Sequence, residues 1–340
     1  MSRNSSVLSL ALGVGLVWAT RKILSQSRRY DLSSKVVLVT GGTRGLGLII
    51  ARQLVAENAR LVICSRNAEQ LQRAETELRN AGAEVLAVRC DVTNRHEVEE
   101  MMEQSVAHFG QLDVLINNAG IIQSGPLDNL SESDYEEAMR THLFAPIHTV
   151  YAALPYLRQR PKARIVNISS IGGKVAVPHL AAYCASKFAL AGFSKALRTE
   201  LMREDILVTT VYPGLIRTGS PRNVFVKGQH QREYALFKTA DSLPLLTGSA
   251  ENAAAEVIDA LKRGQAERVI TPTAKLAALF DQLLPEMSAD LFGALNRLLP
   301  GPAPDGRQNP RLRGYDSESA ASRTFLTAPT DRAARDNNEF

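Results

Sequence analysis

A tyrosine and a lysine four residues apart have the types and spacing needed for proton transfer. Tyr183 and Lys187 open a stretch that is expected to be helical to about Glu204, so the two side chains share one helix face. A phenol has an ordinary pKa of about 10, and a neighbouring ammonium favours its ionised form. The spacing predicts that Lys187 lowers the pKa of Tyr183 and makes the phenol a usable proton donor.

A serine stands thirteen residues before the tyrosine, where a predicted strand ends. Ser170 follows the predicted strand 164–169, and its hydroxyl could hydrogen-bond a substrate carbonyl at the same rim. Ser169 is the competing choice. Because neighbouring residues of a strand point to opposite faces, only one of the two serines can face the cleft.

A glycine-rich turn follows the first predicted strand, residues 35–40, and opens a helix. The turn reads Thr40-Gly41-Gly42-Thr43-Arg44-Gly45-Leu46-Gly47. Glycines let the backbone approach a pyrophosphate closely, while the free N–H groups and positive end of the helix face the phosphate charge. The order of strand, turn and helix predicts a dinucleotide site; the alternative is a turn glycine cluster without a ligand.

Two arginines near this turn predict which dinucleotide binds. An acid at the end of the second strand usually holds a ribose 2′-hydroxyl, whereas a 2′-phosphate favours arginine. Here the second strand ends Cys64-Ser65-Arg66, without an acid, and Arg44 lies inside the glycine turn. The pair predicts NADP(H); the alternative is that both guanidinium groups point to solvent.

Seven short apolar segments alternate with helical stretches and must position these groups. The predicted strands are residues 35–40, 60–65, 84–90, 112–117, 164–169, 206–212 and 268–271. Strands that alternate with helices pair in parallel through right-handed crossovers. The fold class is therefore α/β, a doubly wound, Rossmann-like parallel sheet of about seven strands, with ligands beyond the carboxyl ends of the strands.

With these motifs in place, the chain resembles the short-chain dehydrogenase/reductase family over residues 35–271. The resemblance implies that Tyr183 is the general acid, that Ser170 polarises the carbonyl, and that Lys187 holds the nicotinamide ribose. Asp91 and Val92 would flank the adenine. The motifs that carry the resemblance are the glycine turn, Asn117-Asn118-Ala119-Gly120, Ser170, Tyr183-x-x-x-Lys187, and Pro213-Gly214 followed by Thr218.

The turn, the two arginines and the resemblance together give one set of expected cofactor-binding residues. The resemblance assigns Asn117 to supporting the central strand and the cofactor, and the segment after the sixth strand to the nicotinamide end. The set is Gly41, Thr43, Arg44, Gly45, Leu46, Gly47, Arg66, Asp91, Val92, Asn117, Ala119, Gly120, Tyr183, Lys187, Pro213, Gly214 and Thr218.

One position departs from the family pattern. The family usually has an asparagine in the helix after the fourth strand, whose carbonyl holds a proton-relaying water, and the aligned residue here is His142. Pro146 lacks the N–H that would bond the His142 carbonyl in a regular helix. We hypothesise that the proline supplies the opening and that the imidazole, titrating near neutrality, is a fourth catalytic residue. The alternative is a histidine that only packs.

The N-terminal segment, residues 1–30, is expected to be a leader or membrane anchor. Residues 4–20 are uncharged and largely apolar, and basic residues follow them. The run is shorter than the about 20 residues that a spanning helix needs, and it lacks a clear cleavage site. Membrane contact through residues 4–24 and a leader that packs nowhere are both open. The charge bias favours a cytoplasmic catalytic domain.

The C-terminal part is expected to divide in two after a catalytic domain of residues 31–272. Apolar residues at helical spacing predict an amphipathic extension over 273–300, broken at Pro285, that docks on the core or on a partner copy. Residues 301–340 hold six arginines and six acidic residues with few large apolar groups, which predicts a disordered tail.

Composition excludes several classes of function. The 340 residues are 45% hydrophobic and 22% charged, as in ordinary globular proteins. The net charge of +5 is concentrated in residues 1–34, so no basic stripe for nucleic acid remains. Cys64, Cys90 and Cys184 show no zinc-binding spacing, and no metal is expected.

The expected function is an NADP(H)-dependent oxidoreductase that interconverts a carbonyl and a secondary alcohol, reducing an apolar ketone, acyl or lipid-like substrate. A lid over residues 215–246 mixes apolar side chains with five cations that could meet an anion or only water. A homo-oligomer is expected. The alternative is a cofactor-binding regulator or scaffold that lost turnover through the change at His142.

Overall fold

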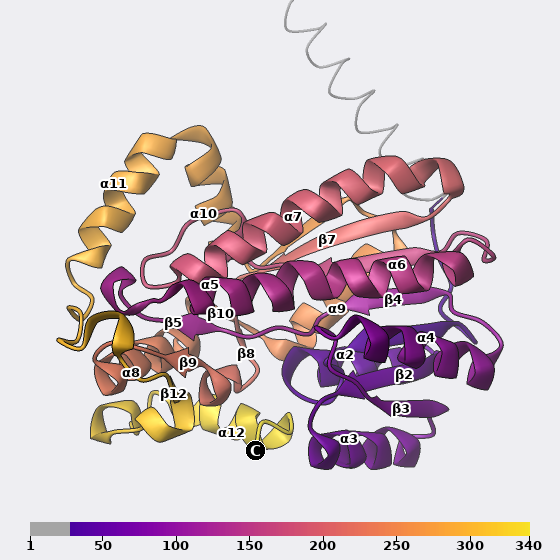
Figure 1. Cartoon of the computed structure of the whole chain (residues 1–340), viewed down its shortest axis with the longest axis horizontal. Coiled ribbons are helices and arrows are strands. Elements are labelled where there is room, and N and C mark those ends of the chain that lie inside the picture. Colours follow the sequence, from indigo (N-terminus) through magenta and orange to yellow (C-terminus); the bar gives the residue numbers. More distant parts are fainter. Residues whose placement is uncertain (1–27) are drawn as a thin grey trace, which may run out of the picture.

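The computed structural model describes residues 28–340. Figure 1 shows a central sheet with helices packed on both faces. The sheet is entirely parallel, in the order β11-β7-β6-β4-β1-β2-β3. The predicted doubly wound α/β fold of about seven strands is confirmed. Its strands are β1 (Val36–Thr40), β2 (Arg60–Ser65), β3 (Val85–Arg89), β4 (Val114–Asn117), β6 (Arg164–Ile168), β7 (Leu207–Pro213) and β11 (Glu267–Ile270).

Two hydrophobic cores lie on opposite faces of this sheet, which explains the continuous apolar runs of its strands. In β1, Val37 and Val39 face one core, and Val36 and Leu38 face the other. The first core is covered by α2 (Gly45–Ala56), α3 (Ala68–Asn80) and α9 (Ala250–Lys262). The second is covered by α4 (Arg95–Phe109), α6 (Ala145–Leu157) and α7 (Ala181–Leu201).

The strand order reverses between β1 and β4, which pair at the middle of the sheet. The glycine turn follows β1, and the Asn117–Gly120 segment follows β4. In doubly wound sheets the crevice beyond such a reversal holds the ligand. The topology therefore brings the two sequence motifs to one crevice.

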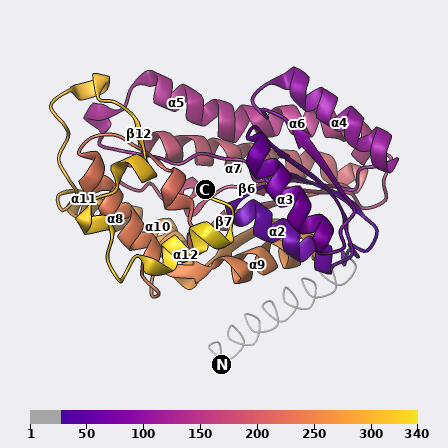
Figure 2. The same cartoon turned by 90° about the horizontal axis from the view of Figure 1, so that it is seen from below.

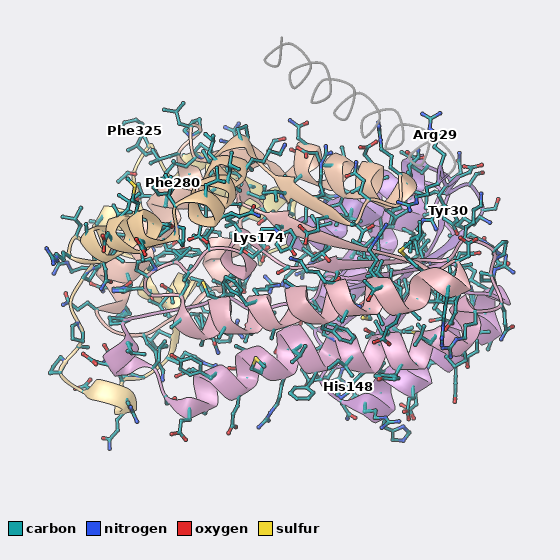
Figure 3. The ribbon with its side chains drawn as sticks, turned by 90° about the horizontal axis from the view of Figure 1, so that it is seen from above. Arg29, Tyr30, His148, Lys174, Phe280 and Phe325 are labelled. Atoms are coloured by element: carbon teal, nitrogen blue, oxygen red, sulfur yellow. The ribbon has the colours of Figure 1, made fainter. Side chains whose placement is uncertain are left out.

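Close to the boundary predicted at residue 31, the described part of the chain enters the first core. Tyr30 and Leu32 are buried in the first core, and the Arg164 guanidinium lies 4.7 Å from the centre of the Tyr30 ring. Figure 3 shows Arg29 and Tyr30 at one end of the molecule, far from Phe280 and Phe325. The predicted membrane-contacting segment, residues 4–24, lies outside the described residues. Within residues 28–340, no helix is both long and apolar enough to span a bilayer.

Two helices, α10 (Pro272–Leu283) and α11 (Pro285–Asn296), follow the last strand of the sheet. Their apolar stripe is exposed, and the predicted docking of this stripe on the core is wrong. The pair leaves the sheet beyond the edge strand β11, so that of α10 only Ala274 is buried. The exposed members of the stripe are Leu276, Leu279, Leu283, Leu284, Met287, Leu291 and Leu295.

The lid after β7 is built from short elements that carry the rest of the chain. They are β8 (Leu215–Arg217), η5 (Ser220–Asn223), β9 (Phe225–Val226), α8 (His230–Ser242) and β10 (Thr247–Ser249). β9 pairs with β5 (Gln123–Ser124) on one side and with β12 (Leu312–Arg313) on the other. The lid is thus tied both to the segment after β4 and to the C-terminal residues.

The predicted disordered tail, residues 301–340, is wrong. It contains β12, several 3₁₀ turns and α12 (Ala328–Asp336), and α12 packs against α8. The buried Lys238 ammonium lies 2.7 Å from Asp331 and 3.4 Å from Glu318, and the Ser242 and Thr330 hydroxyls hydrogen-bond at 2.7 Å. Two acids of the tail therefore share one buried cation of the lid.

Candidate functional site

The glycine turn has a backbone that side chains would block. Gly41 and Gly45 have φ values of +63° and +51°, in the left-handed region that favours glycine. A Cβ on Gly47 would lie 2.2 Å from the Gly41 carbonyl oxygen. Helix α2 begins at Gly45 with no acidic residue in its first turn and no side-chain cap. This geometry fits a dinucleotide pyrophosphate, which needs close backbone approach and free N–H groups.

Asn118 ties the end of β4 to the glycine turn. Its amide nitrogen donates to the Thr40 and Gly41 carbonyls at 3.1 and 3.2 Å. The Thr40 hydroxyl in turn accepts from the main-chain N–H groups of Asn118 and Ala119 at 3.0 and 3.1 Å. Asn118 and Thr40 were not among the expected site residues. Asn118 could have been found from the sequence, because it belongs to the motif Asn117-Asn118-Ala119-Gly120.

Asn117 faces the opposite way, into the protein. Its amide nitrogen donates to Asn167 of β6 at 2.9 Å, and its oxygen accepts from Thr149 of α6 at 2.6 Å. Asn117 therefore joins β4 to β6 and α6 behind the crevice. A role in supporting the central strands fits this geometry.

Charged groups gather beside the turn and the end of β2. Arg44 pairs with Glu339, and Arg66 Nη1 lies 3.5 Å from the Asp91 carboxylate. Burial raises the pKa of Asp91, but local hydrogen bonds and the charge of Arg66 outweigh it and lower the pKa overall. Burial is the main cause that lowers the pKa of Arg313. The positive charges of Arg44 and Arg66 lower it further, which places the three guanidinium groups in one region.

Several other expected contact residues lie around the same turn. Thr43 is buried within the turn itself, and Leu46 packs against the first core. Asp91 and the buried Val92 directly follow β3. A Cβ on Gly120 would lie 3.1 Å from His142 Nε2 and 3.7 Å from Lys187 Nζ, so the segment after β4 reaches the groups considered for catalysis.

Ser170, Tyr183 and Lys187 meet where β6 ends and α7 begins. Ser169 turns inward and donates to the Lys187 carbonyl at 2.9 Å. Ser170 Oγ accepts from Gly172 N at 3.1 Å, and the Ser170 hydroxyl lowers the pKa of the Tyr183 phenol, although burial outweighs this effect. Between the two serines, the geometry therefore favours Ser170. Lys187 Nζ donates to Ile168 O at 3.0 Å and lies 5.7 Å from the centre of the Tyr183 ring.

The acid–base properties of the pair are set mainly by burial. Burial raises the pKa of Tyr183 to about 12, although the hydrogen bond from Ser170 opposes the shift. Burial lowers the pKa of Lys187 to about 7. The predicted lowering of the tyrosine pKa by Lys187 is therefore wrong for the chain by itself. The phenol nevertheless keeps its proton at neutral pH, as a proton donor must, and an anion beside Lys187 would favour the ammonium.

The helix that carries His142 is interrupted at the position where the hypothesis placed an opening. α5 (Glu132–Met139) runs into a π-helical turn over Arg140–Phe144, and α6 follows at once. Ala145 N donates to Arg140 O, five residues back. Pro146 has no N–H to offer the His142 carbonyl, which accounts for the change of helix type.

The His142 imidazole is held in one tautomer. Its Nε2 accepts from Ile121 N at 3.1 Å, so the proton is on Nδ1, which donates to Ser186 Oγ at 2.7 Å. The Ser186 hydroxyl donates to the Tyr183 carbonyl at 2.7 Å. Burial and the charge of Lys187 lower the pKa of His142 well below its ordinary value. The hypothesised titration near neutrality is wrong, and the contacts fit a neutral residue that positions α7.

We expect the His142 imidazole to stay neutral as the pH falls from 8 through the ordinary imidazole pKa of about 6.5. Burial disfavours the imidazolium, so lowering the pH through the ordinary value of about 6.5 should not protonate this ring. The measurement is a pH titration of the histidine ring signals by NMR. The same titration of His142→Asn identifies the signal by its loss. A midpoint for that signal near 6.5 would restore the proton-relay hypothesis.

The segment after β7 closes the crevice on the remaining side. Pro213 ends β7, and a Cβ on Gly214 would lie 2.4 Å from the Thr271 hydroxyl oxygen, which leaves room for glycine alone. Thr218 is buried, and its hydroxyl accepts from Ser220 N at 3.2 Å. Pro213 and Gly214 lie at the carboxyl end of β7, the strand that pairs with β6, and Thr218 follows β8.

The cations of the lid bind partners within the chain. Lys227 pairs with the buried Asp134 at 2.7 Å, and Lys238 pairs with residues of the tail. The Arg222 guanidinium lies 3.8 Å from the centre of the Phe340 ring. Arg217 donates to the Thr247 hydroxyl at 3.0 Å. Of these four cations, Lys227 and Lys238 thus meet carboxylates of the chain itself, and the other two contact an aromatic ring and a hydroxyl.

Among residues 28–340, no group of three or more histidine, cysteine or acidic side chains is arranged so that it could hold a metal ion. The three cysteines, Cys64, Cys90 and Cys184, are free and buried. The candidate site therefore consists of a hydroxyl (Ser170), a phenol (Tyr183) and an amine (Lys187), together with the glycine turn.

Comparisons with known proteins identify the family. A sequence profile described as short chain dehydrogenase matches residues 35–227. The chain is 37% identical over 227 residues to "Dehydrogenase/reductase SDR family member 7B" of Bos taurus, covering 65% of this chain and 70% of that one. It is 36% identical over 185 residues to "Ketoacyl reductase HetN" of Nostoc, covering 54% of this chain and 64% of that one.

A similar protein of solved structure is also named as a reductase. The crystal structure of a variant actinorhodin polyketide ketoreductase with NADPH has a TM-score of 0.63 and 32% sequence identity, covering 72% of this chain and 97% of that one. The chain is thus an oxidoreductase that binds NAD(P) and acts on a small molecule. It belongs to the short-chain dehydrogenase/reductase family.

Proposed function

We propose that the protein reduces an apolar ketone or acyl-linked ketone with NADPH. The observation that carries this proposal is the meeting of Ser170, Tyr183 and Lys187, with Ser170 and Lys187 buried, next to Gly120 of the segment that follows β4. Each of the three is a type that carbonyl reduction requires: a hydrogen-bond donor, a proton donor and a cation. This set supports turnover over the alternative of a regulator or scaffold.

The proton chemistry follows from the environments of these groups. Ser170 donates a hydrogen bond to the carbonyl oxygen and polarises the carbonyl. Bound NADPH supplies the hydride that adds to the carbonyl carbon. Tyr183 then gives its phenolic proton to the oxygen, on which negative charge develops, and the phenolate regains a proton from solvent. Lys187, as an ammonium, holds the ribose and stabilises the phenolate.

Preference for NADPH over NADH rests on the guanidinium groups beside β2. Arg44 and Arg66 lie in one region with Arg313, and β2 carries no acid at its end to hold a 2′-hydroxyl. The similar ketoreductase was solved with NADPH. We therefore assign the 2′-phosphate to Arg44 and Arg66.

The substrate class is inferred from the lid and from the relatives. Leu245 of the lid is 91% exposed and Leu246 is 40% exposed. Leu246 O accepts from Thr273, close to the end of β11. Exposed leucines at the lid favour an apolar ligand over an anionic one, and two of the lid cations, Lys227 and Lys238, already have acidic partners. Two of the similar proteins are named ketoacyl reductase and polyketide ketoreductase.

The test is a panel of apolar ketones and acyl-linked ketones, run with NADPH and with NADH while nucleotide oxidation is followed by absorbance. We expect turnover of at least one compound and higher kcat/KM with NADPH. Tight NADPH binding with no turnover across the panel would favour the regulator instead. Turnover with NADH alone would contradict the assignment of the arginines.

A further inference from the structure

Residues 337–340 lie against the nucleotide-binding turn. Gly45 N donates to Asn337 O at 2.9 Å, and the Asn338 amide nitrogen donates to Thr43 O at 2.8 Å. Gly45 begins α2, so its N–H belongs to the helix end that would face a pyrophosphate. Figure 2 shows the C-terminus close to α2 and α3, in agreement with these contacts. The segment therefore meets the turn through the groups expected to hold the cofactor.

The Glu339 carboxylate lies where an anion would bind. It pairs with Arg44 and accepts from the Asn223 amide nitrogen at 2.7 Å. A Cβ on Gly45 would lie 2.6 Å from Glu339 Oε1, so the carboxylate touches the backbone of the turn. The side chain of Glu339 is 1% exposed. Its guanidinium partner is a group that binds phosphate in proteins, and the carboxylate lies beside the first residue of α2, where the helix end also favours an anion.

The neighbouring residues fix this position from both sides of the crevice. On the lid side, the Asn337 amide nitrogen donates to Thr218 O at 3.2 Å. α12 lies so close to the lid that a Cβ on Gly219 would be 2.3 Å from the Ala334 Cα. On the other side, Arg73 of α3 donates to Phe340 O at 2.6 Å. The segment therefore bridges the lid and α3 across the glycine turn.

We propose that residues 337–340 are an internal competitor of NADPH, with the Glu339 carboxylate in the place of a cofactor phosphate. The inference rests on the proposed function in taking the turn and Arg44 as the NADP(H) site. Glu339 and a phosphate need the same guanidinium, and the Asn337 carbonyl already accepts from the first N–H of α2, so nucleotide binds only after the segment leaves. The apparent affinity for NADPH is reduced by the fraction of molecules in which the segment is docked.

The first test is the dissociation constant of NADPH, measured by calorimetry on the full chain and on Glu339→Ala. Removing the carboxylate takes away one charge-assisted pair of the docked segment, and we expect NADPH to bind about tenfold more tightly. Asp336→Ala is the matched control: it removes an equal charge three residues away, from an exposed side chain. Unchanged or weaker binding by Glu339→Ala would overturn the proposal.

The second test follows the segment itself by hydrogen exchange of the full chain. We expect NADPH to slow exchange in residues 41–47 and to speed it in residues 328–340. Slower exchange in both regions would mean that the segment closes over the nucleotide, and would overturn competition. Absence of NADPH binding in the full chain and in Glu339→Ala would contradict the proposed function and this inference together. NADPH binding without release contradicts only the inference.

Discussion

Replacing Tyr183 by phenylalanine is expected to lower kcat for NADPH-dependent ketone reduction by about 10³-fold. The substitution removes the phenolic proton, which no other group in hydrogen-bond reach replaces: the Ser170 hydroxyl is much less acidic, and His142 is held neutral by its hydrogen bonds. The aromatic ring remains, and with it the edge-to-face contact with His142, whose ring centre lies 5.5 Å away. The fold and the nucleotide turn should therefore be intact.

Two measurements separate loss of chemistry from loss of structure. The dissociation constant of NADPH for Tyr183→Phe should match that of the unsubstituted chain, because the phenol does not contact the glycine turn. Tyr151→Phe is the control, since Tyr151 is an exposed tyrosine on α6. A Tyr183→Phe variant that retains more than about a tenth of the activity would show that another group donates the proton.

Replacing both Arg44 and Arg66 by alanine is expected to reduce the preference for NADPH over NADH by about 100-fold or more. A hydrogen bond to a charged group contributes about 1.5–3 kcal/mol, and each arginine is assigned such a bond to the 2′-phosphate. Only NADPH carries that phosphate. The measurement is the ratio of kcat/KM for the two nucleotides with one ketone substrate.

The ratio is the right quantity because Arg44 also holds Glu339. Loss of Arg44 loosens the C-terminal segment, which should help both nucleotides alike and so cancel in the ratio. Arg95→Ala, an exposed arginine at the start of α4, is the control. If the double substitution weakens NADPH and NADH equally, the two arginines do not recognise the 2′-phosphate.

The strands of the sheet could be predicted from the sequence because the apolar pattern that marks each strand involves only neighbouring residues. Strands such as Val36–Thr40 are buried on both faces, and this makes them continuous β-branched runs that end at glycines. Strand alternation limits the cleft to one of Ser169 and Ser170, and the inward bond of Ser169 to the Lys187 carbonyl is what favours Ser170. The positions of the glycine turn, Tyr183 and Lys187 needed only the order of the elements.

Contacts between distant segments could not be predicted in this way. Arg44 and Glu339 are 295 residues apart, and nothing around Glu339 in the sequence distinguishes it from the other acids of the tail. Lys238 likewise finds Asp331 only because α12 packs on α8. The composition of residues 301–340 predicts disorder because it is rich in charges and poor in large apolar residues. Ion pairs with the buried Lys238 of the lid supply part of the stabilisation that an apolar core would give.

His142 shows how a correct local argument can still lead to a wrong chemical one. The proline rule located the interrupted helix, because a missing N–H is a property of one residue. The acidity of the imidazole depends instead on Ile121, Ser186 and Lys187, which come from two other segments. A pKa is a sum over neighbours in space, and the sequence does not name them.

The close seating of Phe340 has a practical consequence for handling the protein. Its main-chain oxygen accepts from Arg73, and its ring lies under the Arg222 guanidinium. An affinity tag fused after this residue would turn its terminal carboxylate into a neutral peptide group, weaken the contact with Arg73 and loosen the neighbouring Glu339 carboxylate from the turn. Preparations tagged at this end should therefore take up NADPH more readily than untagged ones.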